Sequence, residues 1–569
     1  MLALGGITVA ATPAYPLKLG PTARYLVDQN DRPFLIQGDS PWSLLVQPTR
    51  EEVEQYLSNR RHKGFNSIIV SLIEHFFCDD PPNNRYGDAP FTEAGNYATP
   101  NEAYFAHVDW VLKKAAEYGI QVLLVPSYLG SGGGSEGWYS EMQVNGVTKL
   151  RQYGRYLGQR YKDFDNLIWL NGGDYNPPVN DYVDAIADGI RDFDTRHLQS
   201  AHGGAETTAL DCHPTEAWLA INDSYTYENI LGMAQANYAH APTIPFYLIE
   251  SKYEGDRFNA SNQEIRRQAY WSVFSGACGQ FMGNHPLYEF SAGWQPAMDG
   301  VASRDMANFR RLLDSRSWWL FVPDVNPAIV LAGGGDPASS DPAQSYVTAA
   351  SMPDGSSLWA YVPTGRTLTL DLSQVSGATA QTWWYNPRTG VATAIGQFDT
   401  GGYQDFTTPT NEGDLLDWIL VADDASRNLP PPGMTTLQDW RNHYFTVAEL
   451  LDPEISGNPA DPDHDGRNNL MEYALAGDPT VPDAALTPVD VSIVTSAGDP
   501  FLHLAYTRRK NAADLVFAVT AGNDLQTWSR LVENTTLDHG LTETVTVQDH
   551  APLSGNPQRF VRLETTVTP

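Results

Sequence analysis

Asn166-Leu-Ile-Trp-Leu-Asn-Gly-Gly-Asp-Tyr-Asn176 is the stretch around which the rest of the chain is organised. Its apolar run, 167–170, predicts a short buried strand, and the glycine pair that follows presents the carboxyl group of Asp174. The stretch Pro245-Phe-Tyr-Leu-Ile-Glu-Ser-Lys-Tyr-Glu254 has the same design, with an apolar run that ends on Glu250. Two strands that each deliver one acid at the C-terminal end are typical of acid/base chemistry at the rim of a barrel. We therefore expect Asp174 and Glu250 to face each other across one bound substrate.

Strand-like and helix-like segments alternate over residues 20–320. Continuous apolar runs are typical of strands buried on both faces, and capping boxes at Thr49–Glu52 and Ser261–Glu264 mark the starts of two helices. The expected strands lie at 34–36, 67–73, 121–126, 167–170, 198–202, 218–222, 245–250 and 279–282. Eight strand–helix units predict an α/β fold of the (β/α)8 TIM-barrel type. A doubly wound sheet is the second choice, because no G-x-G-x-x-G motif opens a helix.

Beyond Trp318-Trp319 the pattern changes to short alternating runs separated by Gly, Pro and Asn, which predict β-sandwiches. The expected divisions are a leader or arm at 1–16, the barrel at 17–322, a β-sandwich at 323–425, a Pro-rich linker at 426–434, an EF-hand-like segment at 435–485 and a C-terminal β-sandwich at 486–569. The first residues look like the apolar core and cleavage site of a secretory signal without its basic start. They are either a clipped signal or an apolar arm.

The composition excludes several classes of partner. A net charge of -32 argues against nucleic acids and anionic membranes, and no run of 18 apolar residues predicts a membrane span. Cys78, Cys212 and Cys278 are far apart, so neither a disulfide framework nor a thiolate metal site is expected. The 15 Trp and 28 Tyr residues suit a carbohydrate partner, because the apolar face of a sugar stacks on aromatic rings. The oligomeric state does not follow from the sequence.

In a TIM barrel of this order, Asp174 ends the fourth strand and Glu250 the seventh, on opposite sides of the mouth. A retaining glycoside hydrolase holds its two carboxyl groups about 5–5.5 Å apart, so that one attacks the anomeric carbon while the other protonates the leaving oxygen. An inverting enzyme leaves about 6.5–9.5 Å, which makes room for a water molecule. The alternative is that each carboxylate only binds the amides of its own loop.

The neighbours of the two acids favour different roles. Burial beside Trp169 would raise the pKa of Asp174, as a general acid requires at neutral pH. Lys252 lies two residues after Glu250 and would help to keep it ionised if the two side chains converge.

Other side chains near strand ends are candidates for substrate binding. The polar candidates are Asp39, His75, Tyr225, Tyr227, Asn284 and His285. The candidates for stacking on a sugar are Trp42, Trp138 and Trp294. Tyr225 or Tyr227 is expected to hydrogen bond to Glu250. For each of these residues the alternative is a loop-stabilising hydrogen bond or ordinary core packing.

Four blocks resemble those of a known family: Tyr25-Leu-Val-Asp-Gln-Asn-Asp-Arg-Pro-Phe-Leu-Ile-Gln-Gly-Asp39 with Trp42, Gly64-Phe-Asn-Ser67, Asn171-Gly-Gly-Asp174 and Gly283-Asn-His285. They are similar to blocks of the apiosidase-like glycoside hydrolases. The resemblance implies a TIM barrel of a retaining clan, with Asp174 as acid/base and Glu250 as nucleophile. It also implies exo action on a side chain of a complex, plant cell-wall type polysaccharide. Most of that clan carries Asn-Glu where this chain has Asp174, and the shorter acid would lie farther from the sugar.

The sandwich after the barrel, with Trp383-Trp-Tyr-Asn-Pro-Arg-Thr-Gly390, resembles the collagen-binding-type module that usually follows apiosidase-like barrels. The name of that module implies little about its ligand. We expect either a brace packed on the barrel or a weak glycan-binding module.

Asp461-Pro-Asp-His-Asp-Gly-Arg-Asn-Asn-Leu-Met-Glu472 fits the EF-hand pattern D-x-D-x-D-G-x5-E. The expected ligands of a Ca²⁺ ion are the carboxylates of Asp461, Asp463, Asp465 and Glu472, the backbone carbonyl of Arg467, and Asn469 directly or through water. The alternative is a solvated acidic turn. We expect a structural ion rather than a catalytic one, and a secreted or periplasmic setting where calcium is plentiful.

Two rival functions remain open at the level of sequence. One is a barrel that has lost catalysis and binds glycans or extracellular matrix; a wide separation of the two acids would favour it. The other is a serine esterase, because Gly133-Gly-Ser-Glu-Gly137 matches the G-x-S-x-G elbow. The elbow needs a sharp strand-to-helix turn, which this Gly/Ser-rich loop does not predict. An esterase would also need Ser135 within hydrogen-bond reach of a histidine.

Overall fold

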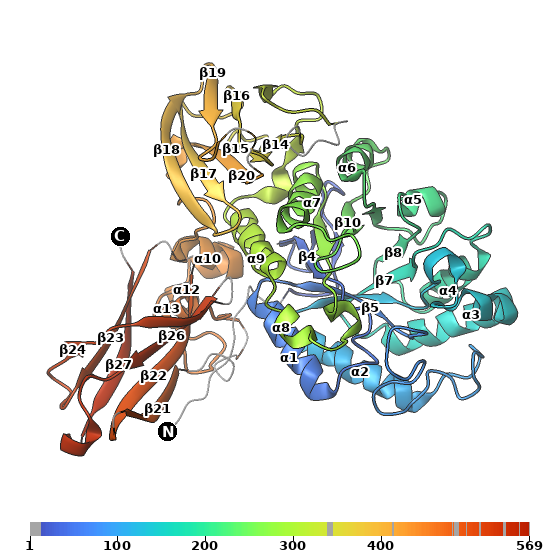
Figure 1. Cartoon of the computed structure of the whole chain (residues 1–569), viewed down its shortest axis with the longest axis horizontal. Coiled ribbons are helices and arrows are strands. Elements are labelled where there is room, and N and C mark those ends of the chain that lie inside the picture. Colours follow the sequence, from blue (N-terminus) through green and yellow to red (C-terminus); the bar gives the residue numbers. More distant parts are fainter. Residues whose placement is uncertain are drawn as a thin grey trace.

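The computed structural model describes residues 13–567 apart from 338–344, 412, 414, 446, 481, 483–488, 497, 511, 513, 539–541 and 557 (Figure 1). Most of the expected leader therefore lies outside the described residues. Three short strands open the described chain: β1 (Lys18–Leu19), β2 (Leu26–Val27) and β3 (Pro33–Phe34). Leu17, just before β1, shares one core with Leu26, Phe34 and the interior of the barrel.

Eight parallel strands form the predicted barrel: β4 (Ile36–Asp39), β5 (Ser67–Ser71), β6 (Gln121–Val125), β7 (Leu167–Gly172), β8 (Gln199–His202), β9 (Asn222–Tyr225), β10 (Phe246–Glu250) and β11 (Gly279–Met282). Their order in the sheet is β8-β7-β6-β5-β4-β11-β10-β9. The amides of Ala220 and Ile221 bond to the carbonyl of Gln199 at 2.9 and 3.3 Å and link the two end strands. The barrel is therefore nearly closed, and the expected α/β fold is confirmed.

Helices surround the barrel: α1 (Arg50–His62), α2 (Glu102–Glu117), α3 (Tyr139–Tyr161), α4 (Asp181–Arg191), α5 (Ala209–Cys212), α6 (Ile230–Ala239), α7 (Asn262–Phe274), α8 (Trp294–Ala297) and α9 (Val301–Asp314) (Figure 1). Both predicted capping boxes are present, with Thr49 capping α1 and Ser261 capping α7. In the described part of the chain, no helix combines the length and the apolar character needed to cross a membrane.

Alternation along the strands separates the barrel interior from the helix-facing surface. In β7, Ile168 and Leu170 point into the barrel core, whereas Trp169 packs among the helices and donates a 2.8 Å hydrogen bond to Asp194. The sixth strand lies at 222–225 rather than at the predicted 218–222. The apolar run misled the prediction because Trp218 packs outside the barrel against alanines of neighbouring elements.

The first sandwich follows the barrel and contains β12 (Val322–Pro323), β13 (Val330–Ala332), β14 (Thr348–Ser351), β15 (Ser357–Val362), β16 (Thr367–Asp371), β17 (Thr379–Asn386), β18 (Val391–Asp399), β19 (Tyr403–Thr407) and β20 (Trp418–Asp424). Six strands form one antiparallel sheet, in the order β12-β14-β15-β20-β17-β18, and β13-β16-β19 form the other. Apolar residues of both sheets make a common core.

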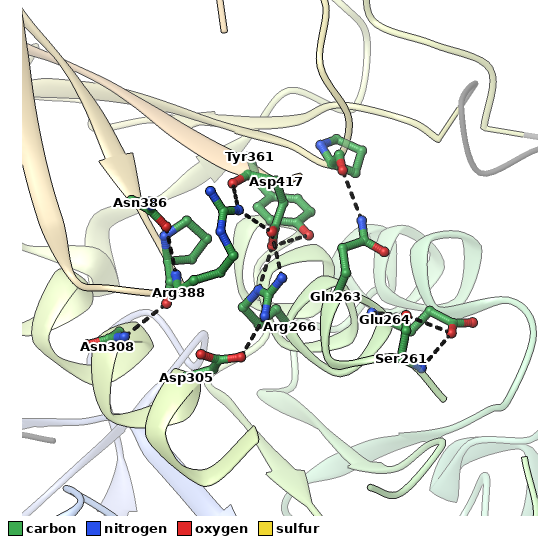
Figure 2. Close-up of polar contacts among 12 residues, drawn as sticks. Ser261, Gln263, Glu264, Arg266, Asp305, Asn308, Tyr361, Asn386, Arg388 and Asp417 are labelled. Carbon is green, nitrogen blue, oxygen red and sulfur yellow. Dashed lines mark hydrogen bonds and ion pairs between the residues drawn. The ribbon is translucent and has the colours of Figure 1, made fainter. Parts of the chain in front are cut away.

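A buried polar network joins this sandwich to the barrel (Figure 2). Arg266 of α7 donates to both carboxylate oxygens of Asp417, at 2.8 and 2.7 Å, and to Asp305 of α9 at 2.6 Å. Arg388 donates to Asp417 at 2.9 Å, and the hydroxyl group of Tyr361 does so at 3.1 Å. Asp417 is fully buried, so every group that neutralises it is supplied by protein.

Aromatic rings surround the network. Tyr270 of α7 stacks on Tyr361 of β15 with 4.8 Å between ring centroids, and Phe274 packs on Trp359 at 5.8 Å. The barrel and the sandwich thus share one apolar cluster. This contact is the expected brace.

The remainder of the chain contains α10 (Leu437–Tyr444), α11 (Val447–Leu450), α12 (Pro453–Ser456) and α13 (Asn469–Leu475), then β21 (Val489–Ser496), β22 (Asp499–Arg509), β23 (Leu515–Gly522), β24 (Ser529–Arg530), β25 (Asn534–Asp538), β26 (Thr542–Gln548) and β27 (Phe560–Val567). The strands form two antiparallel sheets, β21-β22-β26-β25 and β24-β23-β27, with a shared apolar core. The helical segment is attached to this second sandwich through Tyr473 of α13. The hydroxyl group of Tyr473 donates a 2.7 Å hydrogen bond to Asp514.

Candidate active site

The glycine pair after β7 places Asp174 at the mouth of the barrel. Gly172 and Gly173 have φ values of 95° and 133°, a region that favours glycine. A Cβ atom on Gly172 would lie 2.7 Å from the carbonyl oxygen of His202, and one on Gly173 would lie 2.4 Å from the ring of Tyr128. Asp174 itself has a φ of 54°. This turn brings Asp174 to the mouth of the barrel, although as a shorter acid it was expected to lie farther from the sugar.

A bulge aims Glu250 into the same space. In β10, Leu248 pairs with Ser224 of β9 and Glu250 pairs with Tyr225, so Ile249 is an extra residue in the ladder. Strict alternation would place Ile249 and Glu250 on opposite faces, yet Ile249 belongs to the barrel core. The bulge turns Glu250 toward the face that Tyr225 occupies, which is the inside of the barrel.

The two acids meet around a histidine. A ring nitrogen of His202 and one carboxylate oxygen each of Asp174 and Glu250 all lie within 4.8 Å of one another. His202 Nε2 is 3.7 Å from Asp174 Oδ1 and 3.4 Å from Glu250 Oε2. The His202 side chain is fully buried, whereas those of Asp174 and Glu250 are 23% and 10% exposed. A substrate can therefore reach both carboxylates, but His202 acts on it only through them.

His202 was not among the sequence candidates, although a signal for it existed. It ends β8, and Ser200 two residues earlier accepts a hydrogen bond from Tyr247, a residue of the barrel core. Period-2 alternation then puts His202 on the inner face, at the catalytic end of its strand.

Three tyrosines complete the polar shell. The hydroxyl group of Tyr128 donates a 2.7 Å hydrogen bond to Asp174 Oδ2. Tyr227 donates to Glu250 Oε1 at 2.9 Å, and its hydroxyl oxygen lies 2.7 Å from that of Tyr225. The predicted hydrogen bond between a tyrosine of this loop and Glu250 is therefore present. Tyr128 was not predicted.

The surroundings of Asp174 shift its pKa. Burial raises the pKa of Asp174 above its ordinary value of 3.8, the charge of Glu250 adds to the rise, and His202 and the Tyr128 hydroxyl lower it. The pKa shifts in the direction expected for a general acid, but not because of Trp169, which faces Asp194. Lys252 does not approach Glu250 as predicted, because its ammonium group lies between Glu228 and Glu264 at 4.0 and 3.8 Å.

Trp42 is the one predicted tryptophan at the site. Its ring is half-buried and lies over that of His202, with 5.8 Å between centroids and a 30° angle between planes. Its indole nitrogen donates to the hydroxyl group of Tyr253 at 3.3 Å. It can therefore present part of a ring to a sugar while it covers His202.

Three predictions of substrate-binding residues are wrong. Asp39 faces α1, where it is buried, accepts a 2.7 Å hydrogen bond from Tyr56 and pairs with Arg60. Trp138 and Trp294 are 3% and 5% exposed and belong to the main core cluster. Residues that are enclosed in this way have no surface for a sugar, and the loop position of the two tryptophans did not reveal that neighbouring elements cover them.

The remaining polar candidates have partners other than the acid pair. His75 packs on Trp138 and bonds to Glu141 at 3.3 Å. Asn284 is buried and donates to Glu254 at 2.8 Å. His285 is exposed and lies 3.3 Å from Glu289.

Two exposed aromatic residues extend the site and were not predicted. Phe258 is 37% exposed and packs on Tyr227 with 4.5 Å between ring centroids. Phe76 is 57% exposed and contacts Phe77, which packs on Tyr128. Both are joined by ring contacts to the tyrosines that hydrogen bond to the two acids, so they are candidates for sugar stacking.

The aspartates of the EF-hand-like loop are close together. Ligand oxygens of Asp461, Asp463 and Asp465 lie within 4.8 Å of one another, and Gly466 has a φ of 95°, as the turn requires. In the described part of the chain, Asp461 Oδ1 and Asp463 Oδ2 have no hydrogen-bond partner. Asn469 donates from its amide to the carbonyls of Ile455 and Gly457, and Arg467 lies in the turn. Glu472 is buried on α13 and does not belong to the group of three.

The serine esterase reading fails on geometry. Ser135 is exposed in a loop, and β6 ends at Val125, far before it, so no strand turns sharply into a helix at the serine. Among the hydrogen bonds of the described residues, none joins Ser135 to a histidine.

A nearly closed (β/α)8 barrel with one acid after strand four and another at the end of strand seven defines a glycoside hydrolase. Residues 21–320, more than half of the 569, match the model of the apiosidase-like catalytic domain, and the chain belongs to that family. Residues 337–423 match the family named for the collagen-binding domain of a collagenase.

Solved structures agree with this class. One described as a glycoside hydrolase has a TM-score of 0.65 and 25% identity, with 74% of this chain and 99% of that chain covered. A family 5 glycoside hydrolase from Bacteroides vulgatus ATCC 8482 has a TM-score of 0.67 and 24% identity, with 77% and 100% covered. A search of curated proteins gave no match.

Proposed function

We propose that this glycoside hydrolase is a retaining, exo-acting enzyme that removes a terminal apiosyl or related sugar from a side chain of a plant cell-wall type polysaccharide. The retaining mechanism rests on one observation. A carboxylate oxygen of Asp174 lies within 4.8 Å of a carboxylate oxygen of Glu250. That distance suits direct attack, because an inverting pair is about 6.5–9.5 Å apart to admit water. The exo action and the sugar rest on membership of the apiosidase-like family.

Each residue has one task in the two steps. In the first step Asp174 gives its proton to the glycosidic oxygen while Glu250 attacks the anomeric carbon, which forms a covalent glycosyl ester and releases the leaving alcohol. In the second step Asp174 takes a proton from water, and the water oxygen displaces Glu250. Tyr227 hydrogen bonds to Glu250 and fixes the orientation of the attacking carboxylate.

The rival reading, a barrel that binds glycans without cleaving them, is weakened by the same distance. A binding protein has no need to hold two carboxylates close together against their mutual repulsion. An extracellular location is part of the proposal and is supported by the acidic composition and by the collagenase-type module.

The test begins with a panel of aryl glycosides that includes apiosides, and with the anomeric configuration of the first product measured by NMR. We expect retention, and at least a ~10³-fold loss of kcat in Glu250→Gln, because an amide can neither attack nor stabilise an oxocarbenium ion. Glu117→Gln is the matched control, because Glu117 is exposed at the end of α2 on the outside of the barrel. Inverted product, or a near-native rate in Glu250→Gln, would contradict the mechanism.

We also propose that the EF-hand-like loop holds a structural Ca²⁺ ion. The fit is supported by the three clustered aspartates and by their two oxygens that lack hydrogen-bond partners. Asp461, Asp463 and Asp465 would hold the ion, and the carbonyl of Arg467 would complete the turn. Asn469 would add its free side-chain oxygen, and Glu472 would have to move to join. The ion would neutralise the carboxylates at the start of α13.

A further inference from the structure

We propose that His202 is a positioning residue that stays positively charged between Asp174 and Glu250. At each step it stabilises and orients the carboxylate that is ionised. This inference rests on the proposed retaining mechanism and assigns a role to a residue that never touches the sugar. Its geometrical basis is that His202 Nε2 lies 3.4 Å from Glu250 Oε2 and 3.7 Å from Asp174 Oδ1.

The contacts favour a proton on Nε2. If Nε2 carried a lone pair, it would face the ionised carboxylate of Glu250 at 3.4 Å, and the two groups would repel each other. The ring is enclosed by Trp42 on one face and by Tyr225, whose ring centroid lies 4.8 Å away. Such burial removes water as an alternative partner and strengthens the attraction to nearby charges.

The three charged groups whose fields act on His202 are acidic. Asp174 follows β7, Glu250 ends β10 and Asp223 belongs to β9. Burial lowers the pKa of His202, but the hydrogen bond to Glu250 and the charges of Asp174 and Glu250 outweigh it, so the pKa lies above 6.5. Within the described residues, the ion pairs of Asp174 and Glu250 are made by His202 alone, because Lys252 is held by other glutamates.

A fixed positive charge serves both steps of the mechanism. Before attack, Glu250 is ionised and Asp174 is protonated, and His202 stabilises the carboxylate of Glu250. After the ester forms, Glu250 is neutral and Asp174 has lost its proton to the leaving group, so the same charge stabilises the Asp174 carboxylate. The proton of His202 does not move. Only the proton of Asp174 is transferred, first to the leaving oxygen and then back from water.

The same three groups could be ligands of a metal ion, since their ligand atoms lie within 4.8 Å of one another. A metal-bound histidine almost always donates its second ring nitrogen to a carboxylate or carbonyl. His202 Nδ1 is buried and has no hydrogen-bond partner among the residues that the structure describes. Nδ1 would carry a proton both in an imidazolium and in a histidine bound to a metal through Nε2, so the Zn²⁺ and EDTA experiment described below decides between the two.

The first test is the pH dependence of kcat/KM in His202→Gln. Loss of the positive charge raises the pKa of both carboxyl groups, so we expect the acid limb and the basic limb to move upward by about one pH unit each. A purely structural role would lower the rate and leave both limbs in place, which would overturn the proposal. His213→Gln is the control, because His213 bonds to Asp184 on the helix side of the barrel and should shift neither limb.

The second test needs no activity and no folded His202 variant. The chain has 13 histidines, and selective isotope labelling allows their imidazole signals to be followed by NMR during a pH titration. One buried histidine should titrate above pH 6.5 in the wild type and at lower pH in Glu250→Gln. If no signal responds to Glu250→Gln, the proposal is wrong even if the enzyme hydrolyses glycosides.

The two tests also separate this inference from the proposed function. A charged His202 in a protein that cleaves no glycoside would remove the hydrolytic mechanism and leave the electrostatic assignment intact. Activity that is lost with EDTA and restored by Zn²⁺, together with loss of the histidine titration in the Zn²⁺ form, would make His202 a metal ligand and overturn the inference.

Discussion

The hydroxyl group of Tyr227 donates a 2.9 Å hydrogen bond to Glu250 Oε1. Glu206 holds the loop that carries Tyr227, because its carboxylate accepts hydrogen bonds from the Tyr227 amide at 2.8 Å and from the Thr226 hydroxyl at 2.6 Å. The nucleophile is thus oriented by a tyrosine whose own backbone is fixed by a second acid.

Tyr227→Phe should lower kcat by about 10- to 100-fold, because a hydrogen bond to a charged group contributes about 1.5–3 kcal/mol. KM should change little, since the hydroxyl group contacts Glu250 rather than open space. Steady-state kinetics on an aryl glycoside measure both values. Tyr403→Phe, at a tyrosine that is 70% exposed on β19, is the control. An unchanged kcat would show that Glu250 needs no orientation by Tyr227.

Tyr128→Phe should move only the basic limb of the pH profile. Tyr128 donates to Asp174 Oδ2 at 2.7 Å and so stabilises the ionised form, which lowers the pKa of Asp174 against the effect of burial. Without the hydroxyl group the pKa of Asp174 rises further, by about one unit, and Asp174 keeps its proton to a higher pH. The measurement is kcat/KM against pH. A basic limb that moves downward would contradict the assignment of Asp174 as the acid.

Asp417→Ala should lower the free energy of unfolding by about 3–5 kcal/mol, because it leaves Arg266 as a buried charge without its bidentate partner. The network of Figure 2 also loses the carboxylate acceptor for Arg388, which keeps only its hydrogen bond to the backbone carbonyl of residue 417. Urea unfolding followed by tryptophan fluorescence measures the change. Asp314→Ala, which breaks a more exposed pair with Arg310, should cost no more than about 1 kcal/mol. Equal effects of the two substitutions would mean that the interface contributes no special stability.

Calcium should raise the melting temperature of the wild type, and EDTA should lower it. At a concentration one hundred times the dissociation constant, a bound ion stabilises by about 2.7 kcal/mol. Asp463→Asn should abolish the response, whereas Asp490→Asn, at an exposed position of β21, should keep it. Differential scanning calorimetry with and without Ca²⁺ makes the comparison. If neither Ca²⁺ nor EDTA changes the melting temperature, the loop is a solvated acidic turn and the proposed calcium site is wrong.

The acid pair could be predicted because parallel strands bring their C-terminal ends to one rim, whatever the distance between them in the chain. The same rule failed for Asp39, which also ends a strand. Ile36 points into the barrel, so alternation turns Asp39 outward, where Tyr56 and Arg60 enclose it. The position of a residue at the end of a strand predicts that it lies at the rim of the barrel. Whether its side chain points into the barrel or toward the helices must be predicted separately.

The sequence by itself determined the order of strands and helices, the barrel, and the two acids at its mouth, because apolar runs, capping boxes and glycines act on neighbouring residues. Only the tertiary structure decided which side chains reach the site. The bulge at Ile249 aims Glu250 inward, and elements distant in the chain bury Trp138 and Trp294. His202 ends a predicted strand, but its place beside both acids appeared only when β8 was placed beside β7. Burial and charge pairing depend on contacts across the fold, and a linear pattern does not encode them locally.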